Sequence, residues 1–274
     1  MSSPITTARL PAGRGLVADV AILAQDIPLF PVDRVMRLDS CAAARAAARA
    51  RIGWAATFLK AYGLVAREMP MLRSWIAGHL ATCLATSAES VAVLAVNRSI
   101  GDTDRLFWAR LPRPEATPLP ALQRFIDRCA QQPIEEMFKR QLQLDGLPRS
   151  LRRMILRWNL RSTSPKRPSR VGTFSLSTLA GLQASNRFHP TLCTTSLSYG
   201  PLEPDGRCVV TLIADHRVLD GAAVAMALAR LEQVLETEIA AELRAIRAPA
   251  EADVSRGRRG RPQAGRGGDP ATAA

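Results

Sequence analysis

His216 is one of only three histidines in the chain, and it stands where a strand-like segment meets a helix-like one. In "CVVTLIADHRVLDGA" it shares the alternating pattern of a strand with four small or apolar residues, and Asp220 and Gly221 follow after a turn. Burial in such a setting favours the neutral imidazole, which can accept a proton, and Gly221 permits a close backbone approach or an unusual φ. Two interpretations stand: a histidine placed in the turn by chance, or a catalytic base at the end of a strand.

The rest of the sequence offers few other candidates for chemistry. It lacks the glycine-rich phosphate-binding motifs, the G-x-S-x-G elbow and the H-E-x-x-H metal motif. His79 and His189 have no partners at a useful spacing, so we assign both structural roles. The five cysteines are dispersed without a C-x-x-C pair, which indicates a reducing, cytoplasmic setting and predicts no metal site.

The formal net charge of +13 is concentrated in one segment. Residues 139–170 contain a single acid, Asp145, and ten basic residues: Lys139, Arg140, Arg149, Arg152, Arg153, Arg157, Arg161, Lys166, Arg167 and Arg170. Within it, "PRSLRRMILRWNL" spaces Leu151, Met154, Ile155 and Trp158 as the apolar face of a basic amphipathic helix. That helix either packs on its own domain with its arginines exposed, forms an anion or phosphate site, or contacts a membrane surface.

The remaining pattern mixes helices and strands. Helices are predicted over 54–70 and 117–130, and strands over 90–99, 106–111, 172–181, 191–202 and 208–216. Residues 248–274 are rich in Gly, Ala, Pro and Arg, which predicts a disordered tail. No apolar run is long enough for a transmembrane helix, and the N-terminus does not resemble a secretory signal. This order of elements predicts an α+β domain with a mixed sheet.

The string "DHRVLDGA" resembles the H-x-x-x-D-G motif of the CoA-dependent acyltransferases. The closest similarity is to the catalytic domain of the dihydrolipoyl acyltransferase component of 2-oxo acid dehydrogenase complexes, and chloramphenicol acetyltransferase is a more distant relative. "VGTFSLSTLAGL" is similar to the family's glycine-threonine-phenylalanine strand, whose serine falls on Ser177. The resemblance covers residues 25–245. It implies a mixed β-sheet flanked by helices, in the two-layer sandwich of chloramphenicol acetyltransferase.

The resemblance also implies a mechanism. His216 would be the general base, Ser177 the hydroxyl donor to the oxyanion, and Asp220 a structural residue held in an ion pair that shapes the turn. Thr178 is the alternative hydroxyl if the register slips by one, and it joins Gly221 as a candidate substrate-binding residue. Acyl-CoA would be a substrate, with no covalently bound cofactor. A homotrimer with active sites at subunit boundaries is expected.

The predicted organisation is an N-terminal extension (1–24), a catalytic domain (25–247) with a basic insertion at 139–170, and the tail (248–274). About 25 residues precede the resemblance, too few for a lipoyl domain, so the expected acceptor is a thiol, hydroxyl or amine, including a dihydrolipoyl group on a separate protein. The alternative function is a non-catalytic trimeric scaffold. Nucleic-acid binding is disfavoured because no aromatic-interleaved basic motif is present.

Overall fold

The computed structural model describes residues 5–8, 10–11, 13–100 and 103–246. The predicted tail at 248–274 lies outside these residues. Among the described residues, no helix is long and apolar enough to cross a bilayer. The helices of this part are α1 (Arg14–Ala24), α2 (Asp39–Ala47), α3 (Trp54–Glu68), α4 (Leu119–Gln131), α5 (Ile134–Met137), α6 (Lys139–Asp145), α7 (Arg149–Leu160), α8 (Arg167–Val171), α9 (Gly221–Val234) and α10 (Ala240–Ala245). The strands are β1 (Leu29–Arg37), β2 (Ser74–Ala77), β3 (Cys83–Thr86), β4 (Val91–Ile100), β5 (Thr103–Pro112), β6 (Phe174–Leu176), β7 (Thr195–Leu202) and β8 (Arg207–Asp215).

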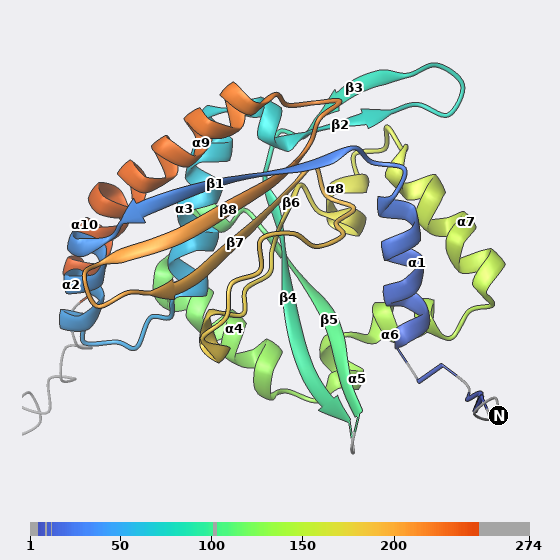
Figure 1. The fold of residues 1–274 in the computed structure, drawn as a ribbon, viewed down its shortest axis with the longest axis horizontal. Helices are drawn as coiled ribbons and strands as arrows, with labels where there is room; N and C mark the ends of the chain where they lie inside the picture. The colour runs from blue at the N-terminus through green and yellow to red at the C-terminus, as the bar shows by residue number, and fades with distance from the viewer. Residues whose placement is uncertain (1–4, 9, 12, 101–102, 247–274) are drawn as a thin grey trace, which may run out of the picture.

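The centre of the molecule is a mixed six-stranded sheet in the order β1-β8-β7-β6-β4-β5 (Figure 1). The short strand β6 pairs in parallel with both β4 and β7, and all other neighbours are antiparallel. A separate hairpin is formed by β2 and β3. The predicted mixed sheet flanked by helices is therefore confirmed.

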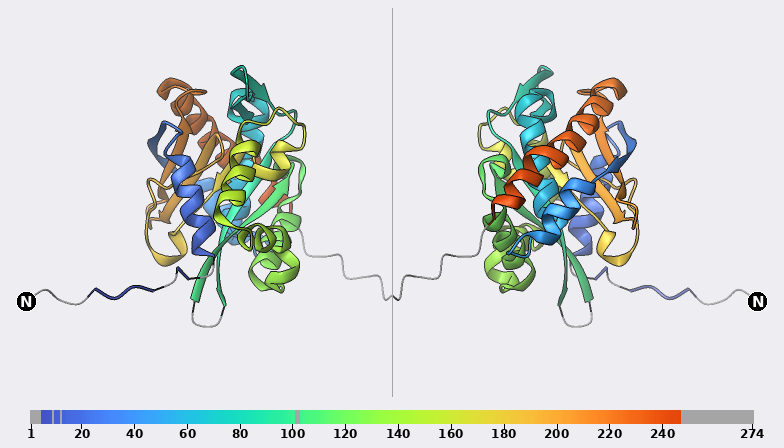
Figure 2. Two further views of the ribbon diagram at one scale, coloured as in Figure 1. Left: turned by 90° about the vertical axis from the view of Figure 1, so that its right-hand side faces the viewer. Right: turned by 90° about the vertical axis from the view of Figure 1, so that its left-hand side faces the viewer.

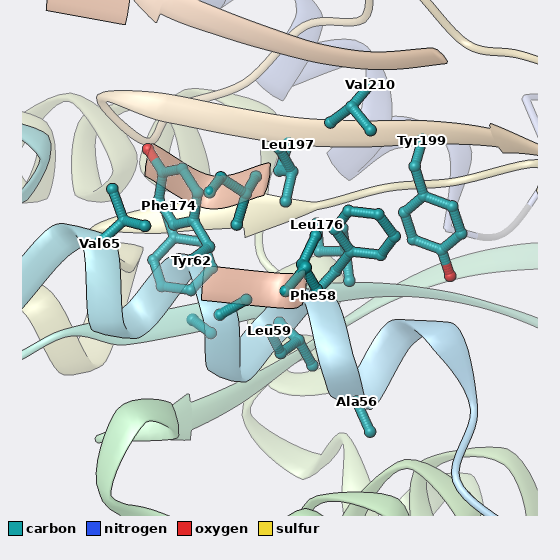
Figure 3. Close-up of a cluster of buried hydrophobic side chains, with 14 of the residues drawn as sticks. Ala56, Phe58, Leu59, Tyr62, Val65, Phe174, Leu176, Leu197, Tyr199 and Val210 are labelled. Carbon is teal, nitrogen blue, oxygen red and sulfur yellow. The ribbon is translucent and has the colours of Figure 1, made fainter. Parts of the chain in front are cut away.

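One face of the sheet carries the main hydrophobic core. Helix α3 packs on this face through aromatic side chains: Phe58 stacks on Tyr199 with ring centroids 4.3 Å apart, and Tyr62 lies 4.5 Å from Phe174 (Figure 3). The Tyr62 hydroxyl donates a 2.7 Å hydrogen bond to Thr195 Oγ1, so the one polar atom of this buried ring is satisfied. Helices α2, α9 and α10 complete the layer (Figure 2, right).

The opposite face is covered by α1 and the basic segment, which forms α6, α7 and α8 (Figure 2, left). One of the three alternatives given by the sequence for this basic amphipathic helix was that it packs on its own domain with its arginines exposed. Helix α7 packs on the domain, but that alternative is wrong in its detail: Leu151, Met154 and Trp158 of the apolar face are 38%, 60% and 61% exposed, whereas Arg152 is 7% exposed. The helix is anchored by charge, so its apolar pattern does not report which side faces the protein.

The anchor is Asp19 of α1, which is 1% exposed although it falls within the predicted N-terminal extension. Its carboxylate accepts hydrogen bonds of 2.6 Å from Nε of both Arg152 and Arg153. Burial alone would raise the pKa of Asp19, but the hydrogen bonds from the two guanidinium groups outweigh burial and hold it below its usual value. A buried carboxylate shared by two arginines thus fixes α7 against α1.

Candidate active site

His216 directly follows the last residue of β8. Its backbone N–H donates to the Pro28 carbonyl at 3.0 Å, which fixes the chain next to β1. Its ring lies against Phe30 of β1, with centroids 4.5 Å apart. Its Nδ1 lies 3.2 Å from the carbonyl oxygen of Leu219, on the far side of the turn. Backbone and ring are therefore both held in one orientation.

The contact with Leu219 determines which ring nitrogen is free. A carbonyl oxygen can only accept, so Nδ1 carries the proton in the neutral ring and Nε2 keeps its lone pair. Nε2 makes no hydrogen bond with any residue that the structure describes. This is the tautomer that a general base needs. The expected apolar burial of His216 is wrong for the single chain, because the residue is exposed.

The turn after His216 is shaped by an ion pair, although not by the expected one. Arg217 forms a bidentate pair with Asp215, with distances of 2.9 and 2.8 Å. Asp220 makes no ion pair with a described residue. Its carboxylate instead accepts a 3.0 Å hydrogen bond from Ala223 N and caps α9, as short polar residues commonly do at a helix start. Asp220 has a structural role, but Asp215 is the partner of the arginine.

Gly221 is the first residue of α9, and neither reason expected for a glycine there is found. Its φ is not positive, and a Cβ built on it would meet no atom within 4 Å. The single chain therefore contains no close approach to Gly221 that a side chain would prevent.

Ser177 lies just beyond β6 on the opposite face of the sheet from the main core. Its neighbours Phe174 and Leu176 belong to that core, whereas Ser175 and Ser177 line a cavity of about 650 Å³ beneath α1 and α7. The Ser177 hydroxyl makes no hydrogen bond with a described residue, so it is free to donate. The Thr178 hydroxyl is already used: it donates to the Tyr199 carbonyl at 2.7 Å and accepts from Ala180 N. Of the two candidate hydroxyls, only Ser177 is available.

The structure does not bring Ser177 and His216 together within one chain. Strand register places Ser177 level with Ser198 and Thr211, five residues from His216 along β8 and two strands away. With about 3.3 Å per residue and about 4.8 Å between strands, the two sites are roughly 19 Å apart. They also lie on opposite faces of the sheet. A single chain therefore cannot use both residues in one reaction.

His189 was assigned a structural role from sequence, and its surroundings are more polar than that assignment implied. It lines the Ser177 cavity and contacts Asn186 through Nδ1 at 3.1 Å and Ser196 Oγ through Nε2 at 2.7 Å. Ser175 donates to Ser196 at 2.6 Å and so extends the chain of hydrogen bonds to the cavity wall. Burial lowers the pKa of His189. The sequence around His189, "NRFHPTL", gives no sign of these hydrogen bonds, because Ser175 and Ser196 lie on the strands β6 and β7.

Within the part of the chain described, no group of three or more His, Cys, Asp or Glu side chains is arranged to hold a metal ion. All five cysteines are free thiols, and Cys83 alone among them is exposed.

No protein-family model and no curated protein sequence matches the chain. Similarity appears among solved structures. A probable dihydrolipoamide acetyltransferase from Listeria monocytogenes 4b F2365 is 16% identical, with a TM-score of 0.60 over 88% of this chain and 95% of its own. A truncated catalytic core of the 2-oxoacid dehydrogenase multienzyme complex from Thermoplasma acidophilum is 16% identical, with a TM-score of 0.60 over 85% of this chain and 99% of its own. The Azotobacter vinelandii dihydrolipoamide acetyltransferase is 17% identical, with a TM-score of 0.59 over 89% of this chain and 99% of its own.

The chain therefore has the fold of an acyltransferase catalytic core. More particularly, it is the fold of the probable and the established dihydrolipoamide acetyltransferase and of the 2-oxoacid dehydrogenase complex core named above, and it covers nearly all of their length. The resemblance inferred from His216 and Ser177 is confirmed at the level of the fold.

Proposed function

We propose that this protein transfers an acyl group between CoA and a thiol, hydroxyl or amine acceptor, with His216 as the general base. The observation that carries the proposal is the orientation of the histidine. Nδ1–H donates to the Leu219 carbonyl, so the exposed Nε2 is left with a free lone pair. The shared fold supports the same assignment.

In the proposed reaction, His216 Nε2 takes the proton of the acceptor while the acceptor's sulfur, oxygen or nitrogen attacks the thioester carbonyl carbon. The carbonyl oxygen becomes an oxyanion, and the Ser177 hydroxyl donates a hydrogen bond to it. Collapse of the tetrahedral intermediate breaks the carbon–sulfur bond. The departing CoA thiolate receives the proton from His216, which returns to its neutral state. No acyl-enzyme forms.

The roughly 19 Å between His216 and Ser177 in one chain supports a site built by two subunits, as in the expected homotrimer. His216 of one copy would meet Ser177 of the next across a heterologous, ring-closing interface. The cavity beside Ser177 supplies room for the acyl group or the acceptor. Because α1 packs on α7 through Asp19, we propose that the catalytic domain includes α1 and spans residues 14–246, and does not begin at residue 25.

The test uses purified protein, a panel of acyl-CoAs of increasing chain length, dihydrolipoamide and simple alcohol and amine acceptors, with free CoA thiol as the readout. His216→Ala should lower the rate by about 10²- to 10⁴-fold. Ser177→Ala should lower kcat by about 10²- to 10³-fold. Circular dichroism and oligomer size of both variants serve as the folding control. Wild-type protein that turns over no acyl-CoA, with a cellular role that survives His216→Ala, would instead support the scaffold function.

Shared sites can be tested separately by mixing. Coexpressed His216→Ala and Ser177→Ala chains, each inactive alone, should form mixed trimers in which one site of three has both residues intact, which is about a quarter of all sites once the unmixed trimers of random assembly are included. Activity should return to about that fraction of wild type. Mixed trimers without recovered activity would contradict a site divided between subunits.

A further inference from the structure

A second cavity, of about 740 Å³, lies between the end of α1, the β2–β3 hairpin, α7 and the ends of β7 and β8. Its size is typical of a small-molecule site. Its wall carries two aspartates, Asp26 and Asp215, and five arginines: Arg153, Arg157, Arg161, Arg167 and Arg217. The two aspartates can neutralise only two of the five arginines, which leaves the wall with an excess of three positive charges. The cavity therefore favours an anion.

Arg167 is the least expected of these residues. It is 2% exposed, and it has no carboxylate within 4 Å among the described residues. One Nη donates to the Gly172 carbonyl at 2.7 Å, and the guanidinium lies 4.5 Å from the centre of the Trp75 ring. Its buried Nε has no hydrogen-bond partner. A buried cationic donor left unpaired is costly, so the Arg167 guanidinium has hydrogen-bonding capacity that no described residue satisfies.

Further donors belong to side chains that line the same cavity. Arg153 is held to Asp19 through Nε, but its buried Nη2 has no hydrogen-bond partner. Arg157 lies on α7, and Arg161 lies one helical turn further on, just after the last residue of α7; both are exposed. Neither side chain makes a hydrogen bond or ion pair with any residue the structure describes. Arginine forks suit phosphate oxygens, which they bind bidentately.

The cavity also has an aromatic wall. Trp158 and His79 stack with their ring centroids 4.0 Å apart and their planes at 16°. Trp158 is 61% exposed, which is unusual for a tryptophan in a pocket wall. An exposed aromatic face beside arginines is suited to a stacked base that carries phosphates.

Finally, the arginine-lined cavity adjoins the Ser177 cavity. Leu192 and Cys193 line both. A ligand with its phosphates among the arginines could therefore extend past these two residues to the Ser177 hydroxyl. An extended molecule with a charged end and a reactive end fits this arrangement.

From these observations we propose that the arginine-lined cavity binds an adenosine phosphate, with the base on Trp158 and the phosphates on Arg157, Arg161 and Arg167. This rests on the proposed function for its natural source, which is the nucleotide end of CoA. The basic segment is thus a substrate anchor, and the pantetheine arm runs toward Ser177. A free nucleotide shares the same chemistry, so the experiment separates the two sources.

The experiment is isothermal titration of the whole protein with CoA, 3′-dephospho-CoA, adenosine 3′,5′-bisphosphate, ADP and pantetheine. The main variant is Arg157→Gln/Arg161→Gln, whose exposed side chains have no internal partners to lose. Arg149→Gln is the matched control: it lies on the same helix, is 68% exposed and does not line the cavity. Trp158→Ala tests the stacking surface, and Arg167→Met tests the buried arginine.

Wild type should bind CoA more tightly than adenosine 3′,5′-bisphosphate, and pantetheine weakly. The double variant should weaken CoA binding by about 10- to 100-fold, from the loss of charge-assisted hydrogen bonds. Trp158→Ala should weaken it by about tenfold or more. Arg149→Gln should bind as wild type does. If ADP binds as tightly as CoA, the site belongs to free nucleotides and the assignment to CoA is overturned.

The inference and the proposed function can fail independently. If acyl-CoA is turned over in a His216-dependent way and the double variant binds CoA normally, the cavity is not the anchor. If the double variant loses CoA binding but wild type shows no acyl transfer, the anchor stands and the catalytic proposal falls. Single-stranded RNA that binds more tightly than CoA, with the same dependence on Arg157 and Arg161, would overturn the inference in favour of a nucleic-acid site.

Discussion

Replacing Asp19 by asparagine removes the carboxylate that holds α7 against α1. Asp19 is almost fully buried and lies 2.6 Å from both Arg152, whose side chain is 8% exposed, and Arg153, which is 23% exposed. Removing one partner of a buried pair costs about 3–5 kcal/mol. Because Arg153 can turn partly into water, we expect the lower end, about 3 kcal/mol. For a domain of this size that corresponds to a Tm lower by about 6–12 °C.

The measurement is urea unfolding at pH 7, with hydrogen exchange of the α1 and α7 amides to detect loss of the contact without global unfolding. Arg149→Gln is the control, since Arg149 lies 4.0 Å from the same carboxylate but is 68% exposed. Its effect should stay within about 0.5 kcal/mol. An Asp19→Asn protein with unchanged urea midpoint and unchanged exchange in α1 and α7 would refute the argument that charge anchors this layer.

The same contact has a pH dependence of known sign. Hydrogen bonds from the two arginines, against the opposing effect of burial, keep the pKa of Asp19 below its ordinary value of about 3.9. Its contribution to stability is therefore complete above that value and is lost as the pH falls through the lowered pKa. The difference in unfolding free energy between wild type and Asp19→Asn should shrink below about pH 4.

Three further outcomes can be checked by thermal or urea unfolding. Gly221→Ala should be neutral or stabilise the fold by about 0.4–1 kcal/mol, because a Cβ at this position meets no other atom within 4 Å. Gly172→Ala should destabilise the fold by about 1–3 kcal/mol, since its φ is +97° and its Cβ would lie 2.2 Å from Val93 Cγ2. Equal effects of the two substitutions would contradict both predictions. Asp220→Ala should cost about 1 kcal/mol from the lost helix cap, and Asp220→Ser should recover it. Burial lowers the pKa of His189, so wild-type stability should fall as the pH drops below about 6.5, and His189→Gln should remove that slope; an unchanged slope would assign it to other groups.

The sequence alone predicted the elements whose pattern is local. The helix ending before Pro70 and the strands around β4, β5, β7 and β8 have the periodicity expected of them, and the structure confirms them. The strand β1 was missed, because in "LFPVDRVMR" a proline and three charged residues interrupt the apolar ones and break the strict alternation of a strand. Such a composition is typical of an edge strand, and its pairing with β8 is decided by residues nearly 180 positions away.

His216 and Ser177 could be selected from sequence because each lies within a short string that resembles a motif of the CoA-dependent acyltransferases. Their separation, by contrast, follows from strand register and from the face each side chain takes, and neither is local. The same holds for α7. Its amphipathic pattern showed an apolar face that includes Met154 and Trp158, but Asp19 on α1 binds Arg152, so that Arg152 is buried and these two apolar side chains are exposed. Periodicity could not reveal that partner, since it is more than a hundred residues away and buried charge pairs leave no repeating pattern.

The sequence by itself thus determined the fold class, the candidate base at the end of a strand and the location of the excess positive charge. Only the tertiary structure decided which of ten basic residues are neutralised, which are left without partners, and that Asp215 rather than Asp220 pairs with an arginine. The physical reason is that charge and hydroxyl chemistry depend on burial and on neighbours within about 4 Å. Those neighbours come from α1, β7 and β8, which are brought together only when the sheet forms.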